Sequence, residues 1–95
     1  MTQQYLCGEL AWRLSQLECA AAGQRSRCAV HQLRRDAELA QPFALCGIAR
    51  RALELADDLC WDALQQGRVS AFEVEAAIAA ELHEFAVCAR LLDEA

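Results

Sequence analysis

The sequence contains no lysine, a single proline and no long apolar run. A membrane-spanning helix needs roughly 18 consecutive apolar residues, so we do not expect the chain to cross a membrane. Residues 1–4 show neither the basic start nor the apolar core of a secretory signal peptide, which favours a cytoplasmic protein. The missing lysine, beside abundant Ala and Arg, is typical of a GC-rich bacterial genome.

Motifs for catalysis are also missing. The chain has no glycine-rich phosphate loop, no nucleophile elbow and only two histidines. We therefore expect no enzyme, no cofactor, and no residue with a catalytic role. Val and Ile are scarce, so the sequence gives β-strands little support.

The charge is unevenly distributed along the chain. Residues 1–51 carry seven arginines and four acids, a net charge of +3, whereas residues 52–95 carry two arginines and ten acids, a net charge of −8. The total of −5 disfavours nucleic acid as a direct ligand, because phosphate binding requires concentrated positive charge. Clusters of opposite sign suit head-to-tail association or an acidic partner, and they are equally typical of solvated helix faces.

The hydrophobic content is high for a short chain. Of the 95 residues 56% are hydrophobic, whereas about 45–50% is usual. A chain of this length forms one domain and leaves much of its surface in water. With a membrane excluded, the excess predicts a protein interface, beginning with a second copy of the same chain.

Gly23, Pro42 and Gly67 divide the chain into four segments rich in Ala, Leu, Glu, Gln and Arg. Pro42 suits the first turn of the third segment, and Gly67 suits the position just after its end. The segments predict a single all-α domain, residues 1–95, folded as a small antiparallel four-helix bundle. The predicted helices cover residues 3–22, 25–40, 43–66 and 71–93.

Each predicted helix has one main apolar stripe with the spacing of a helical face. The stripes consist of Leu6, Leu10, Leu14, Leu17 and Ala21; of Val30, Leu33, Ala37 and Ala40; of Leu45, Ile48, Ala49, Ala52, Leu55, Ala56, Leu59 and Ala63; and of Val74, Ile78, Leu82, Phe85, Ala89 and Leu92. Glu81 falls within the last stripe, where we expect an ion pair with an Arg of another helix or exposure at the edge of the stripe.

The start of the fourth helix carries a local signal. Ser70 and Glu73 have the spacing of a capping box, in which each side chain accepts a backbone N–H of the first turn. Val69 and Val74 occupy the flanking positions of a hydrophobic staple. This pattern predicts where the helix begins and has no bearing on function.

Two helices carry a second apolar line. In the first helix Tyr5, Trp12 and Cys19 repeat every seven residues, roughly opposite the leucines. Trp61 projects from the charged side of the third helix. The second line of the fourth helix consists of Ala76, Ala80, His83, Val87 and Leu91.

Aromatic side chains clear of the core are typical interface anchors, although either Trp could also fold over the edge of the bundle. The small residues of the fourth helix suit a helix–helix seam across a two-fold axis. The first helix would then contact a partner. The sequence equally allows the reverse, in which the first helix forms the dimer and the fourth helix contacts the partner.

The six cysteines form no CxxC pair, so we expect free thiols and no metal site. Cys28 and His31 stand three residues apart, and with His83 and Cys88 they would make a Cys₂His₂ zinc set. Only Cys28 and His31 are closely spaced, which argues against this zinc site. Cys28 faces away from the core stripe near several arginines and is the best candidate for a reactive thiol. A thiol- or metal-responsive sensor using Cys28 and His31 is the alternative function.

In size, helical make-up, acidity and lack of catalytic residues, the chain resembles the small antiactivators with which bacteria sequester LuxR-type quorum-sensing regulators. The two-faced helices holding Tyr5, Trp12, Ala80 and Val87 contribute to this resemblance. It implies a homodimer that binds a transcriptional activator and prevents that activator from dimerising or reading DNA. The same features would also suit a secretion chaperone or an antitoxin-like adaptor.

Overall fold

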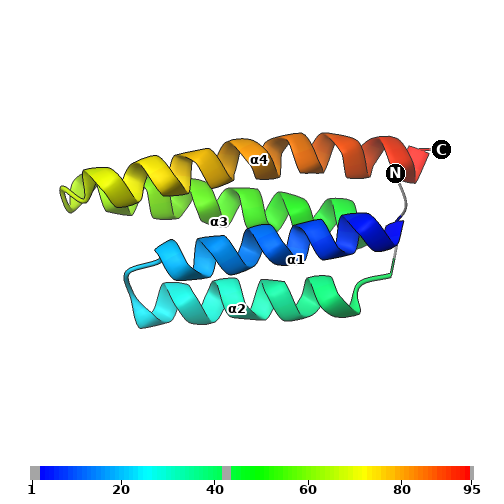
Figure 1. The fold of residues 1–95 in the computed structure, drawn as a ribbon, viewed down its shortest axis with the longest axis horizontal. Coiled ribbons are helices and arrows are strands. Elements are labelled where there is room, and N and C mark those ends of the chain that lie inside the picture. Colours follow the sequence, from blue (N-terminus) through cyan, green and yellow to red (C-terminus); the bar gives the residue numbers. More distant parts are fainter. Residues whose placement is uncertain (1–2, 42–43, 95) are drawn as a thin grey trace.

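The computed structural model describes residues 3–41 and 44–94, without the side chains of residues 3 and 92–94. Four helices run antiparallel to their neighbours and confirm the predicted all-α bundle (Figure 1). The α1–α2 hairpin packs against the α3–α4 hairpin, and α4 contacts both α3 and α1. The helices are α1 (Gln3–Ala20), α2 (Gln24–Leu39), α3 (Leu45–Gln65) and α4 (Val69–Glu94).

The core consists mainly of the predicted stripes. Every stripe residue of the first helix is buried, and four of its leucines are among the largest fully buried side chains. In α2 and α3 the stripes are buried except for Ala40 and Leu55, which are half-buried against the core. Sequence periodicity missed Cys60, which is buried beside Leu59 because it also lies on the inner side of α3.

The first connection follows Ala20 and contains Gly23, which caps α2 without a side-chain hydrogen bond. Arg27 of α2 donates from Nε to the carbonyl of Ala21 at 2.9 Å. A cation at this place satisfies a carbonyl and opposes the negative end of the α1 dipole. The prediction that α1 extends to residue 22 was two residues too long.

The turn between α3 and α4 depends on Gly67. Its φ of 73° lies in the left-handed region, which glycine adopts without steric cost. The N–H of Arg68 donates to the carbonyl of Ala63 at 2.9 Å, and that of Gly67 to Leu64 at 3.2 Å. These two bonds form a Schellman motif and confirm Gly67 as the residue after the helix end. Pro42, predicted in the first turn of α3, lies outside the described residues.

Helix α4 begins two residues earlier than predicted. The carbonyl of Arg68 accepts the N–H of Phe72 at 2.9 Å, so Ser70 already lies inside the first turn. The predicted capping box is therefore wrong, and Val69 and Val74 are both exposed rather than packed as a staple. The early start follows from the Schellman turn, which delivers the chain directly into the next helix.

The buried side of α4 includes Ala79, which the predicted stripe omits, and differs from the stripe at one further position. Val74 is half exposed, and Glu75 is fully buried in its place. Both residues stand within one turn of Ile78, three or four positions away, so periodicity alone permits either and apolarity favoured the valine. Ile78, Leu82, Phe85 and Ala89 are buried as predicted, and the side chain of Leu92 lies outside the described residues.

Candidate protein-binding surfaces

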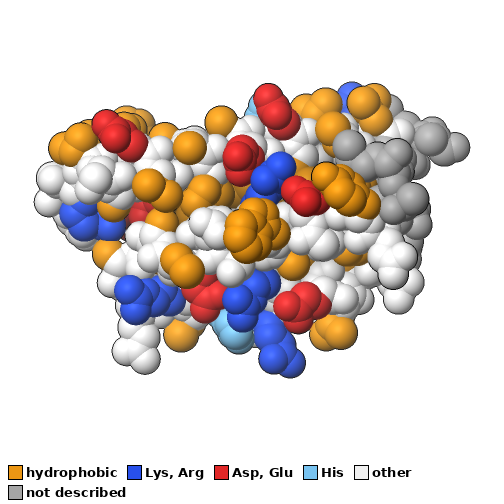
Figure 2. Space-filling model, in the orientation of Figure 1, with side chains coloured by type: hydrophobic (Ala, Val, Ile, Leu, Met, Phe, Trp, Pro, Cys, Tyr) orange, Lys and Arg blue, Asp and Glu red, His pale blue; other side chains and the backbone are white. Residues whose placement is uncertain are grey.

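The outer side of α1 presents a line of exposed side chains. Tyr5 is 55% exposed, Trp12 is 59% exposed, and Cys19 is also exposed. The prediction that these residues point away from the core is confirmed. We call this line the α1 face. Figure 2 shows apolar side chains scattered over the side of the molecule formed by α1 and α4, with acidic and basic groups between them.

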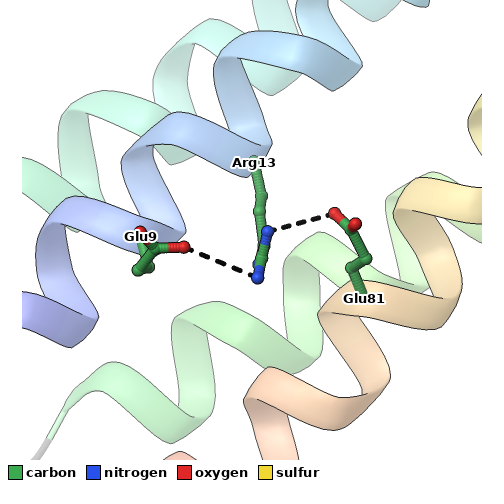
Figure 3. A network of polar contacts seen from close by, with 3 residues as sticks. All are labelled: Glu9, Arg13 and Glu81. Atoms are coloured by element: carbon green, nitrogen blue, oxygen red, sulfur yellow. Dashed lines mark hydrogen bonds and ion pairs between the residues drawn. The ribbon is translucent and has the colours of Figure 1, made fainter. Parts of the chain in front are cut away.

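A three-residue ionic network lies on the same side. Arg13 of α1 donates from Nη1 to Glu81 Oε2 of α4 at 3.1 Å (Figure 3). Its Nη2 atom lies 3.5 Å from Glu9 Oε2, one helical turn away. The predicted ion pair of Glu81 with an Arg of another helix is thus confirmed. The network ties α1 to α4 and gives this side charges of both signs.

A second surface follows the seam between α3 and α4. Two adjoining hollows share Asp57 and Cys60 as lining residues, and together we call them the α3–α4 groove. The first is also lined by Leu53, Ala76, Ala79, Ala80 and His83. The second is also lined by Trp61, Leu64 and Phe72. The groove therefore joins Trp61 to the second apolar line of α4, which sequence reasoning treated separately.

The members of that line differ in depth. Ala76 is half-buried and packs against the core, so it belongs to the floor of the groove. Ala80 and His83 are exposed along its edge. Val87 is 48% exposed, and Leu91 is exposed as well, both beyond the groove. Trp61 is 65% exposed and is available for contact with another protein.

Asp57, Cys60 and His83 line one hollow, and these residue types can serve nucleophilic catalysis. The thiol of Cys60 is not activated for nucleophilic catalysis. Burial, together with the carboxylates of Glu75 and Asp57, raises the pKa of Cys60 to about 11. At neutral pH Cys60 is therefore protonated, whereas an attacking thiol must be a thiolate. The arrangement fits packing beneath a groove better than chemistry.

Glu75 lies beneath the same region and is fully buried. Its Oε1 atom is 3.9 Å from Arg68 Nη1, and neither of its oxygens has a hydrogen-bond partner among the described residues. Burial raises the pKa of Glu75 above its ordinary 4.5; Arg68 opposes the shift and Asp62 adds to it. Sequence reasoning missed this residue, since nothing in the pattern distinguishes it from an exposed acid.

The residues of the alternative sensor function lie on α2. Cys28 is exposed. His31 Nδ1 lies 3.3 Å from Glu18 Oε1 and 3.2 Å from Arg34 Nη2, within an ionic cluster that joins α2 to α1. Among the described residues no three His, Cys, Asp or Glu side chains gather as metal ligands, so the zinc set with His83 and Cys88 does not form there. All six cysteines are free.

Comparisons with known proteins add no relative. Within residues 3–41 and 44–94, no helix combines the length and apolarity required to cross a membrane. The chain matches no known protein family, no curated protein and no solved structure.

Proposed function

We propose that this chain is a non-enzymatic regulator that forms a homodimer and sequesters a protein partner. One observation carries the proposal: nine large apolar side chains are exposed in the described part of the chain, and both tryptophans are among them. Exposed apolar side chains that lie together on one surface are usual at sites of protein contact, because exposed apolar surface costs free energy in water. The α1 face and the α3–α4 groove supply one surface for each partner.

The free energy gained by burying exposed apolar side chains can be compared with the cost of association. Burying a large side chain fully stabilises a complex by about 1.5–3 kcal/mol, and roughly half of that remains available for a side chain that is half exposed. Three such side chains from each subunit would contribute about 5–9 kcal/mol. This is comparable with an association cost of about 4–15 kcal/mol. These six side chains therefore offset the association cost, and the micromolar dimer that we expect, which needs a surplus of about 8 kcal/mol, must bury further apolar surface.

A transcriptional activator is the proposed class of partner. The acidic C-terminal half disfavours direct DNA binding, so an effect on transcription would have to pass through another protein. The resemblance to antiactivators of LuxR-type regulators favours the same partner class. Such a regulator needs no catalytic residue and no cofactor, only a surface that covers part of the activator.

A reporter experiment tests this role. The chain is expressed in a bacterium that carries a LuxR-type activator and a reporter gene under its promoter. We expect reporter output to fall while the abundance of the activator stays constant. The matched variant Trp61→Ala should restore output, because truncating an exposed aromatic anchor weakens an interface without disturbing the core. Unchanged output with the wild-type chain present at equal abundance would reject this class of activator as the partner.

A further inference from the structure

We propose that the α3–α4 groove is the docking site for a basic amphipathic helix of the sequestered partner. The inference rests on the proposed function and deepens it, since it names the surface and the chemistry of the segment that it binds. Two independent features of the groove carry it: the small apolar residues of its floor and the sign of the charge around it.

The floor of the groove suits a helix. Cys60, Ala76 and Ala79 are small and wholly or partly buried, so the backbone of a docked helix could approach closely. Trp61 and Phe72 line the continuation of the groove near the α3–α4 turn. A helix laid in an apolar groove contacts it through residues spaced i, i+3, i+4 and i+7. The groove thus offers an apolar track with an aromatic anchor at one end.

The carboxylate that lines this track is that of Asp57. The stretches that line it, residues 53–64 and 72–83, contain seven acids and no arginine. Glu75 is buried and Glu81 pairs with Arg13, which leaves five exposed acids on these stretches. Of these five, Asp57 lines the groove, Glu54, Asp58 and Glu73 lie elsewhere on the two stretches, and Asp62 lines a separate hollow with Ala22 and Gly23. An approaching helix would be favoured if it carried Arg or Lys beside its apolar anchors.

The same charge argues against a second copy of the chain as the occupant. Contact across a two-fold axis places each patch against itself, so Asp57 and its acidic neighbours would face their own copies. Like charges placed together in an interface are destabilising. The α1 face lies beside Glu9, Arg13 and Glu81, which include both signs and permit self-contact. We therefore assign self-association to the α1 face and the partner to the groove.

Peptide binding tests the assignment. The probe is a fluorescein-labelled helical peptide of about 15 residues, with Leu at the i, i+3, i+4 and i+7 positions and Arg on its flanks. A second peptide has every Arg replaced by Glu. We expect the Arg peptide to bind at least about tenfold more tightly than the Glu peptide at low salt, with the difference shrinking as salt rises. Equal binding of both peptides, or binding of neither, overturns the inference.

A matched pair of variants locates the site. Ala80→Arg places a cation on the edge of the groove, whereas Ala77→Arg adds the same charge to an exposed position of the same helix that does not line it. We expect Ala80→Arg to weaken the Arg peptide at least about tenfold and Ala77→Arg to weaken it no more than about twofold. Equal effects of the two substitutions would overturn the groove as the site. Both positions are exposed, so helical circular dichroism should be unchanged.

Sedimentation of the same variants separates this inference from the proposed function. If Ala80→Arg remains a dimer and no longer binds the Arg peptide, the groove stands as the docking site and the homodimer stands as well. If Ala80→Arg becomes monomeric while Ala77→Arg remains a dimer, the groove is the seam between two copies. The inference then fails and the homodimer stands. If the wild type binds the Arg peptide and is monomeric, the docking site stands and the homodimer fails.

Discussion

Glu75 shows most plainly how one residue can work against the fold. A carboxylate without hydrogen bonds in the core carries a desolvation cost, which Arg68 at 3.9 Å offsets only in part. The folded chain therefore binds the proton of Glu75 more tightly than the unfolded chain, whose ordinary pKa is 4.5. Its unfavourable contribution is fully present above the raised pKa and disappears as the pH falls below 4.5.

The substitution Glu75→Gln should therefore stabilise the protein at neutral pH. The amide has nearly the shape of the protonated acid and no charge, so we expect the free energy of unfolding at pH 7 to rise by about 1–2 kcal/mol. The gain should shrink toward zero as the pH falls below 4.5, since wild-type Glu75 is then protonated in both states. Urea unfolding at several pH values measures it.

The control for this experiment is Glu73→Gln, two residues earlier and exposed. It removes the same charge from the same helix and should change the free energy of unfolding by no more than about 0.5 kcal/mol. A loss of stability in Glu75→Gln at pH 7, or the same gain from both variants, would show that the carboxylate of Glu75 is not the destabilising group.

At the scale of elements, the turn between α3 and α4 rests on backbone conformation. An added Cβ at Gly67 would meet no atom within 4 Å, so any cost of Gly67→Ala comes from its φ of 73°. We expect this variant to lose about 1 kcal/mol of unfolding free energy. Gly47→Ala, within α3 and equally free of contacts, should instead gain about 0.5–1 kcal/mol, because alanine favours helices. Urea unfolding measures both variants. If both gain or both lose unfolding free energy, this explanation is contradicted.

The sequence predicted the helices well because their signals are local. Gly67 ends α3 as expected, and the heptad of Tyr5, Trp12 and Cys19 faces outward as expected. The choice between Val74 and Glu75 could not be made, since it depends on how α4 is rotated against α3 and α1. The groove was hidden for the same reason: only the packing of α3 on α4 brings Trp61 and Ala80 to one seam.

The whole molecule is a thin bundle. Its Cα trace measures 42 × 21 × 16 Å, so the four helices form one small core and keep their outer sides in water. In such a shape most of a second apolar line on a helix stays outside the core, and only Ala76 of the line on α4 packs against it. That geometry explains why Trp12 and Trp61 are exposed on different helices.

Sedimentation equilibrium of the wild type and Trp12→Ala tests the central claim, association through exposed apolar surface, most directly. Trp12 is 59% exposed, so its truncation should spare the core. We expect a wild-type homodimer at micromolar concentration and a dissociation constant raised about 30-fold in Trp12→Ala, equivalent to about 2 kcal/mol. Equal dissociation constants for the wild type and Trp12→Ala would show that the dimer forms through a surface other than the α1 face. A wild type that stays monomeric over about a 100-fold concentration range, or about 2.7 kcal/mol in association free energy, would contradict self-association.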